Sequence, residues 1–361
     1  MQSRIEQVSR REWLQSTAAI TLAAAGGSAI GGCGRRGPVL KVFNWSDYID
    51  EDAIAQFEEQ TGSTLVYDNY SSDSELETRL ATGAGSYDVV FPSDRALAAL
   101  LAKDLLRPLD RPLLPNYHHL DQKFLGRPFD VLNRFSVPYF VGSLAVGIRT
   151  DHVKGPVKGL EPLFEPAHRG RITMLDDMEN VVAAALAHLG YPFNSVEAEH
   201  LAEAQRLLTE QKPLVQAYTS DSYRERLISG EAWAALGWSG DFLQADKELT
   251  EVNSEARIAA VIPEGGTMLW MDSMVIPRRA ENVELAHAFI NHLLEPEVAS
   301  KNAQSVNYAT PNAAARGLLP PEILANESIY PPPEIIDRCG WLKDRGADIE
   351  KIERVWRMVR G

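Results

Sequence analysis

Three tryptophans stand within three residues of an aspartate, each at a place where an expected strand gives way to a turn. The pairs are Trp45 with Asp47, Trp238 with Asp241, and Trp270 with Asp272. The face of an aromatic ring attracts a cation by roughly 0.5–2 kcal/mol, and a carboxylate accepts charge-assisted hydrogen bonds from an ammonium group. An aromatic wall with interleaved carboxylates therefore predicts a site for an aliphatic amine, whose methylene groups the rings would cover.

The segment LWMDSMVIP, residues 269–277, raises the question of what pairs with its aspartate. Val275 and Ile276 indicate a buried strand, and a carboxylate beside such a strand is costly unless something pairs with it. Taken alone, a tryptophan–aspartate pair is more often a core ring with a capping aspartate, and that alternative stays open for each pair. Three pairs at comparable junctions favour a shared site.

The sequence offers little to catalysis. It contains no Gly-rich phosphate loop, no nucleophile elbow, no HExxH motif and no Cys/His metal cluster. Glu284 and His287 could share a metal at helical spacing, but we expect them on a solvated helix face. Asp176 and Asp177 would point in opposite directions on a strand, which suits an acid/base pair poorly. We expect a binding protein rather than an enzyme, with no metal and no cofactor.

The composition bounds the class of partner. A chain of 361 residues can form two domains, and 45% hydrophobic with 24% charged residues is ordinary for a globular protein. The formal net charge of -14 disfavours nucleic acid, because phosphate contacts need Lys and Arg. It suits a cationic small ligand.

The first 33 residues are expected to be an export signal rather than part of the fold. The segment SRREWLQ carries paired arginines of the twin-arginine type, an apolar run follows, and AIGGC resembles a lipoprotein cleavage site. Cys33 would become the lipidated first residue, with residues 34–38 as a tether. The alternative is a plain N-terminal helix. Cys339, the only other cysteine, is expected to be a passive thiol.

Strands and helices alternate along the first part of the mature chain. Expected strands lie at 39–45, 63–70 and 87–92, with helices between them whose ends carry Asp50, Gly62 and Gly83 as caps. This order predicts a parallel sheet with helices on its faces, and in such sheets ligands bind beyond the carboxyl ends of the strands. The segment 45–48 and Ser93 both lie at such ends.

Further elements are expected beyond a long surface connection at 107–133. Residues 136–151 are strand-like but interrupted by Gly142 and Gly147, so this segment is expected to cross between lobes. A second α/β stretch runs from about 153 to 263, followed by the Trp270 segment and a helix at 283–294.

Together, the motifs FNWSDYI, YDVVFPSD, LDDMENV, LGWSGD, WMDSMVIP, NYATPNAAARGLL and IYPP resemble those of periplasmic spermidine/putrescine-binding proteins of polyamine ABC transporters, over nearly the whole mature chain. The resemblance implies an α/β, two-lobed periplasmic-binding-protein fold (type II-like) with a hinge of crossing strands. It implies a first lobe of 39–140 and 275–328, a second of 141–274, and a helical tail of 329–361.

The resemblance also implies roles for individual residues. Trp45 and Tyr48 would form an aromatic wall with Ser46 and Asp47 as polar contacts, and Ser93 would follow the third strand. In the second lobe, Asp177 would be an acidic contact, Trp238 a stacking ring and Asp241 a carboxylate for the ligand. Trp270 and Asp272 match an aromatic-plus-aspartate pair, and Tyr308 a tyrosine lining the cleft.

Three positions depart from the family pattern: Arg95, where the pattern has an aromatic, small or apolar residue, Asn180, where it has glutamate, and Leu342, where it has a polar residue. Asp94 could neutralise Arg95, or Arg95 could grip a ligand carboxylate.

The resemblance implies a periplasmic protein, expected to be a monomer, that captures a polyamine such as putrescine or spermidine for an ABC permease and ATPase. The export and lipidation motifs imply that it is a membrane-anchored lipoprotein. A ligand with both amine and carboxylate, or a sensor subunit feeding a receptor, are the alternatives.

Overall fold

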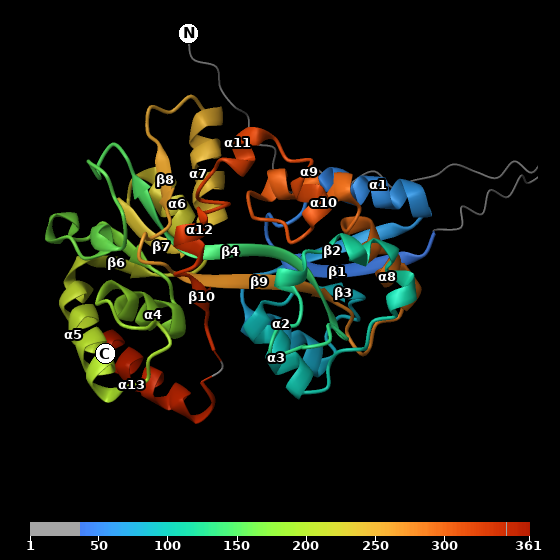
Figure 1. Cartoon of the computed structure of the whole chain (residues 1–361), viewed down its shortest axis with the longest axis horizontal. Helices are drawn as coiled ribbons and strands as arrows, with labels where there is room; N and C mark the ends of the chain where they lie inside the picture. Colours follow the sequence, from blue (N-terminus) through green and yellow to red (C-terminus); the bar gives the residue numbers. More distant parts are fainter. Residues whose placement is uncertain (1–36, 344) are drawn as a thin grey trace, which may run out of the picture. The chain divides into compact units, whose positions relative to one another are not determined.

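The computed structural model describes residues 37–343 and 345–361, which form one compact unit. Its strands join in a ten-stranded sheet of order β2-β1-β3-β9-β4-β7-β5-β6, with β8 beside β4 and β10 beside β9 (Figure 1). The strands are β1 Val39–Trp45, β2 Thr64–Tyr70, β3 Val89–Val90, β4 Ser136–Arg149, β5 Ile172–Met174, β6 Val215–Tyr218, β7 Ala234–Trp238, β8 Ile258–Val261, β9 Met268–Val275 and β10 Gly340–Trp341.

Helices connect and cover these strands, and none in the described part is long and apolar enough to cross a membrane. They are α1 Glu51–Thr61, α2 Asp73–Thr82, α3 Asp94–Ala102, α4 Met178–His188, α5 Ala198–Gln211, α6 Tyr223–Ser229, α7 Ser239–Glu251, α8 Val283–Leu293, α9 Pro296–Val306, α10 Ala313–Arg316, α11 Pro321–Leu324, α12 Pro333–Ile336 and α13 Ile349–Arg360.

The expected parallel start is confirmed, because β1 pairs in parallel with both β2 and β3. The helix signals are confirmed as well. The Asp50 side chain accepts a hydrogen bond from the Asp52 amide at the start of α1, and α1 ends at Gly62 in the left-handed conformation. Helix α2 ends in the same way at Gly83. The carboxyl ends of β1 and β3 therefore open at one edge of the sheet.

Strand β4 runs without a break through most of the segment that was expected to be interrupted. Its first half pairs antiparallel with β9, and its second half pairs with β7 and β8 (Figure 1). Gly142 and Gly147 do not interrupt it, contrary to the expectation from the sequence. They sit where a Cβ atom would come within 2.2 Å of the Trp270 ring and 2.3 Å of the Phe242 ring. These glycines make room for aromatic rings and leave the strand intact.

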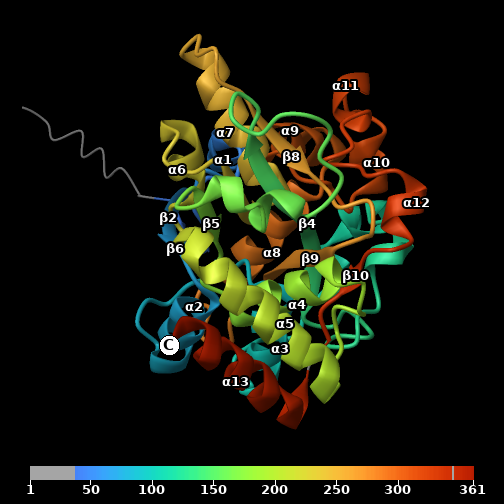
Figure 2. The ribbon, with the colours of Figure 1, turned by 90° about the vertical axis from the view of Figure 1, so that its left-hand side faces the viewer.

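Three groups of buried side chains flank the sheet. One, centred on the second half of β4, runs from Leu144 to Met268 along the chain and also takes in α13, which packs against α5 (Figure 2). The other two lie around β1 and β3 and contain Phe43, Phe57 and Phe289. Strand β4 passes from one hydrophobic environment to the other, so it links both parts of the molecule covalently.

The connection at 107–133 contains three short 3-10 helices, η2 Arg111–Leu113, η3 Pro115–His119 and η4 Gln122–Phe124. His287 anchors it, because its Nε2 accepts the Asp110 amide at 2.9 Å and its Nδ1 lies 2.7 Å from the Val283 carbonyl. The expectation that His287 lies on a solvated helix face is wrong, since its side chain is buried. Both ring nitrogens are engaged by backbone groups, so neither is available to bind a metal together with Glu284.

A buried carboxylate fastens β1 to the start of α8. Asp88 accepts backbone amides from Lys41 at 3.0 Å, Glu281 at 2.9 Å and Asn282 at 2.8 Å. Asp88→Ala would leave these donors without a partner, at about 1–3 kcal/mol per buried group. We expect the free energy of unfolding to fall by about 3 kcal/mol, measured by urea denaturation. Glu59→Ala on the exposed face of α1 should change it little, and a loss below about 1 kcal/mol for Asp88→Ala would contradict this role.

Candidate functional site

Four aromatic rings meet where β9, β7 and the segment after α9 converge. The Trp270 ring lies 4.8 Å from Tyr308 and 6.1 Å from Trp238, in both cases nearly perpendicular. Tyr48 adds a third edge-to-face contact, 5.8 Å from Tyr308. Centroid spacings of 4.5–7 Å with tilted planes are the favoured geometry of aromatic pairs. The rings thus form a connected wall, which we call the aromatic box.

Backbone geometry shapes this box. Gly142 lies opposite Trp270 in the β4–β9 register, and its missing Cβ leaves space for the indole. Gly240 does the same for Tyr308, because a Cβ there would come within 2.6 Å of the ring. Tyr308 follows Asn307, a non-glycine residue with φ of +61° that ends α9. Close packing of backbone against ring therefore fixes the positions of the Trp270 and Tyr308 rings.

Asp272 lies beside the box on β9 and is buried. It makes no ion pair with any residue in the described ranges. Burial raises the pKa of Asp272 well above the ordinary carboxyl value, the charges of Asp73 and Asp94 add to the rise, and the Tyr48 hydroxyl opposes it. An ionised Asp272 therefore lacks a cation in the described protein.

Two further polar atoms of the box, on Tyr48 and Trp270, are also buried. The Trp270 indole N–H is buried and has no hydrogen-bond partner among the described residues, and the buried Tyr48 hydroxyl lies near Asp272, where it opposes the rise in pKa. Tyr48 itself is held in place, because its backbone carbonyl accepts the Tyr139 hydroxyl at 2.8 Å. Buried polar groups without partners are uncommon in folded proteins. Here the Tyr48 hydroxyl adjoins Asp272 and would accept a hydrogen bond from an ammonium group bound there.

Asp241, in the first turn of α7, is the second carboxylate of the box. It accepts hydrogen bonds from the hydroxyl of Tyr308 at 2.6 Å and from that of Tyr223, which is shorter still. Burial raises the pKa of Asp241, and the two tyrosines pull it back down. Tyr223 was not expected from the sequence, because no local pattern around it signals contact with a residue 18 positions away.

A further cluster of acidic side chains lies near the starts of α3 and α4. The Arg95 guanidinium lies 3.0 Å from Asp177, 2.9 Å from Glu179 and 3.7 Å from Asp73. The idea that Asp94 neutralises this guanidinium is wrong, because Asp94 accepts only the backbone amide of Arg95. Although burial alone would lower the pKa of Arg95, the carboxylates raise it, so the guanidinium stays charged.

Ser93 and Asp177 both act as helix caps here. The Ser93 hydroxyl accepts the Ala96 amide and donates to Asp73 at 2.6 Å. Asp177 accepts the amides of Glu179 and Asn180. Asp176 lies apart, exposed and paired with Arg360 at 2.5 Å.

The remaining expected residues lie at the edge of the box. Trp45 is half-buried, donates its indole N–H to the Phe91 carbonyl at 3.0 Å and contacts Tyr70 at 4.4 Å. Ser46 and Asp47 are exposed, and Asp47 pairs with Arg224 at 3.2 Å. The structure therefore does not bring these two polar residues into the buried part of the site.

The two other departures from the family pattern have local explanations. Asn180 is buried in the first turn of α4, where its amide is capped by Asp177. Leu342 packs against the group of buried side chains around the second half of β4. Neither places a charge in the site.

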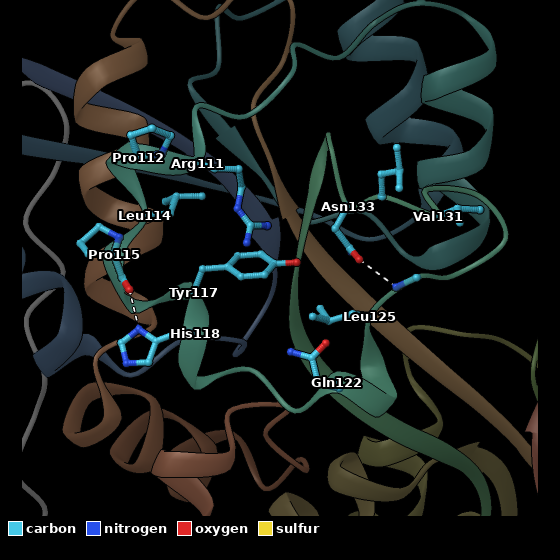
Figure 3. Close-up of a pocket in the computed structure, with 12 residues that line it drawn as sticks. Arg111, Pro112, Leu114, Pro115, Tyr117, His118, Gln122, Leu125, Val131 and Asn133 are labelled. Carbon is cyan, nitrogen blue, oxygen red and sulfur yellow. Dashed lines mark hydrogen bonds between the residues drawn. The ribbon is translucent and has the colours of Figure 1, made fainter.

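A hollow of about 930 Å³ lies elsewhere, along the 107–133 connection (Figure 3). The Arg111 guanidinium stacks 3.0 Å above the Tyr117 ring there, and Asn133 accepts the Gly126 amide at 2.8 Å. Its lining contains no carboxylate. It is broad and open, and it could not neutralise a cation. We therefore place the candidate site at the aromatic box.

Comparison with known proteins identifies the family. The family model described as bacterial extracellular solute-binding protein matches residues 52–329. This chain belongs to the bacterial extracellular solute-binding proteins. Such a solute-binding protein captures a ligand outside the cytoplasm and is not an enzyme.

Individual relatives cover almost the whole solute-binding protein. A putrescine/cadaverine-binding protein of Pseudomonas aeruginosa is 34% identical over 331 residues, 89% of this chain and 93% of the relative. A spermidine/putrescine-binding periplasmic protein of Salmonella typhimurium is 33% identical over 85% of this chain and 87% of its own. The crystal structure of the substrate-binding protein PotD of a spermidine/putrescine ABC transporter from Streptococcus pneumoniae superposes with a TM-score of 0.79 at 30% identity, covering 90% of this chain and 98% of PotD. The two-lobed α/β fold is confirmed.

The unpaired state of Asp272 has a consequence for stability. Its pKa in the folded protein lies above the ordinary value of 3.8, so the neutral carboxyl is favoured by folding. That contribution is present below the ordinary pKa and is lost as pH rises through the folded one. In protein refolded to remove bound amines, Asp272→Asn should therefore raise the unfolding midpoint at about pH 8, and the difference should vanish at about pH 4.

The control for this measurement is Asp221→Asn, which alters an exposed carboxylate and should leave the midpoint unchanged at both pH values. A midpoint for Asp272→Asn below that of the wild type at about pH 8 would mean that the folded ligand-free protein stabilises the ionised carboxylate.

Proposed function

We propose that this solute-binding protein captures a polyamine or related aliphatic diamine and delivers it to an ABC importer. One observation carries the proposal: Asp272 is a buried carboxylate without a cation, set beside a box of aromatic rings. A protonated amine would pair with Asp272, and the faces of Trp270 and Tyr48 would cover its methylene groups. The names of the relatives from Pseudomonas aeruginosa and Salmonella typhimurium support the same class of ligand.

The two carboxylates of the box would hold the two ends of a diamine. Tyr308 lies between them, and its hydroxyl donates a hydrogen bond to Asp241. Burial raises the pKa of Tyr308 most, and the charges of Asp241 and Asp272 raise it further. Trp238 and Trp270 would flank the chain between them. Trp45 would close the wall from the first strand, with Ser46 and Asp47 at its rim.

The other expected residues would act on the ligand indirectly, through neighbouring side chains. Ser93 and Asp177 both cap helices. In addition, Ser93 donates a hydrogen bond to Asp73, and Asp177 accepts one from Arg95. We therefore propose that these two residues shape the acidic end of the cleft. A ligand carboxylate gripped by Arg95 is not favoured, because three protein carboxylates already surround the guanidinium. The geometry offers no support for an amine-plus-carboxylate ligand, and none for a sensor in place of a transporter subunit.

The lobes would close about the β4–β9 pair. We propose a first lobe of 39–140 and 275–328 and a second of 141–274, with the hinge near Gly142 and residues 272–275. The separate groups of buried side chains on either side of β4 support this division. The tail at 329–361 would move with the second lobe, because α13 packs against α4 and α5.

We further propose that the protein is a monomer held at the membrane by a lipid on Cys33 and exported by the twin-arginine route. Residues 1–36 lie outside the described ranges, so this part rests on the sequence motifs. A permease and an ATPase of the importer would be its partners.

The ligand proposal is tested by calorimetry with putrescine and spermidine. Removing one member of a buried charge pair costs about 2–5 kcal/mol, so Asp272→Asn should weaken binding by roughly 30-fold to several thousand-fold. Trp270→Ala should weaken it too, through lost contact area. Asp176→Asn, on the exposed side of the same protein, serves as the matched control and should bind like the wild type. Wild-type affinity of Asp272→Asn for every amine would refute the proposal.

The anchor is tested in the native host. Cys33→Ser should release the protein from the membrane fraction into the soluble periplasm, while Cys339→Ser should leave it membrane-bound. Wild-type protein that is already soluble and starts upstream of Cys33, shown by mass spectrometry, would contradict lipidation.

A further inference from the structure

The contacts of Arg95 join two parts of the chain that are far apart in sequence. Arg95 lies in the first turn of α3, whereas Asp177 and Glu179 lie 82 and 84 positions later at the start of α4. Its two terminal nitrogens point to different carboxylates, at 2.9 Å to Glu179 and 3.0 Å to Asp177. A fork of this kind is the characteristic way in which a guanidinium fixes acidic groups.

The carboxylates around Arg95 are fixed independently of it. Asp177 is held by the two amides of α4 that it caps, and Glu179 is buried with Arg345 at 3.4 Å on its far side. Asp73 is held by the Ser93 hydroxyl. These acidic side chains therefore form a cation site that does not depend on Arg95 to exist. Arg95 fills it.

This filled cation site adjoins the aromatic box. The Ser273 amide donates to the Pro92 carbonyl at 3.1 Å, which brings the strand residue after Asp272 alongside the residue before Ser93. The charge of Asp73, one of the carboxylates around Arg95, also reaches Asp272 and raises its pKa, after the larger effect of burial. A ligand held at Asp272 and extending toward α3 would thus meet Arg95.

We propose that Arg95 is a resident cation that occupies the position of a third ammonium group and so restricts the site to ligands with two. This inference rests on the proposed polyamine function and adds its specificity. A diamine would bind between Asp241 and Asp272 without reaching the guanidinium. The additional ammonium of a triamine would have to approach a like charge whose carboxylates are already taken, and the two cations would repel.

The test measures the affinities of putrescine and spermidine by calorimetry for wild type, Arg95→Ala and Arg278→Ala. The wild type should prefer putrescine by at least about tenfold, which corresponds to about 1.4 kcal/mol. Arg95→Ala frees the carboxylates of Asp177 and Glu179, so spermidine should gain at least about tenfold relative to putrescine. Arg278→Ala removes another guanidinium that pairs with a carboxylate far away in the sequence, Asp104, and should leave the ratio unchanged.

Two further variants complete the design. Arg95→Lys keeps the charge and should keep the preference for putrescine, whereas Arg95→Gln removes the charge with less loss of volume and should behave like Arg95→Ala. Arg95→Gln carries the test if the alanine variant does not fold, as judged by circular dichroism.

Two outcomes overturn the inference. A wild type that binds both amines equally would exclude selection, and equal losses for both amines in Arg95→Ala would make Arg95 only a tie between segments. Failure of the proposed function looks different, since no amine would then give a binding signal with the wild type.

Discussion

The organisation of this protein depends on one unfavourable arrangement, a carboxylate buried beside aromatic rings without a cation. Asp272 sits on β9 in the middle of the sheet, where water cannot solvate it well. Burying an ionised group without a partner is among the costliest arrangements in a folded protein. Two neutral polar groups of the box, the Tyr48 hydroxyl and the Trp270 indole nitrogen, are buried as well. A protonated amine would pair with Asp272 and donate to the Tyr48 hydroxyl, so the cost of burying this carboxylate becomes selectivity for a cation.

The fold supports this arrangement from both sides. Strand β4 carries Gly142 against Trp270, and α7 carries Gly240 against Tyr308, so close backbone contact sets the spacing of the rings. The two carboxylates differ in their surroundings. Asp241 is satisfied by two tyrosine hydroxyls, whereas Asp272 has no cation in the described protein. One end of the site is thus prepared by hydrogen bonds and the other is left for charge pairing.

The sequence predicted the elements better than the contacts between them. Alternating strands and helices and the caps at Asp50, Gly62 and Gly83 are local signals, and they identified the parallel start of the sheet. Of the three tryptophan–aspartate pairs, the two at Trp238 and Trp270 bring their rings into contact, whereas Asp47 lies outside the buried part of the site. Contacts between residues far apart in the sequence left no such local signal. Examples are the hydrogen bond from Tyr223 to Asp241 and the ion pair between Arg95 and Glu179. Gly147 was expected to break a strand because its use, space for the Phe242 ring, is visible only in three dimensions.

The most direct test of the central claim is the proton balance of binding. Burial raises the pKa of Asp272, whereas aliphatic ammonium groups titrate near the lysine value of about 10. Titrations of putrescine in buffers with different heats of ionisation report protons released. We predict release of about one proton per ligand at a pH below the raised pKa, falling toward zero above it, and no such release from Asp272→Asn. Identical proton release by Asp272→Asn and the wild type across this range would contradict the account.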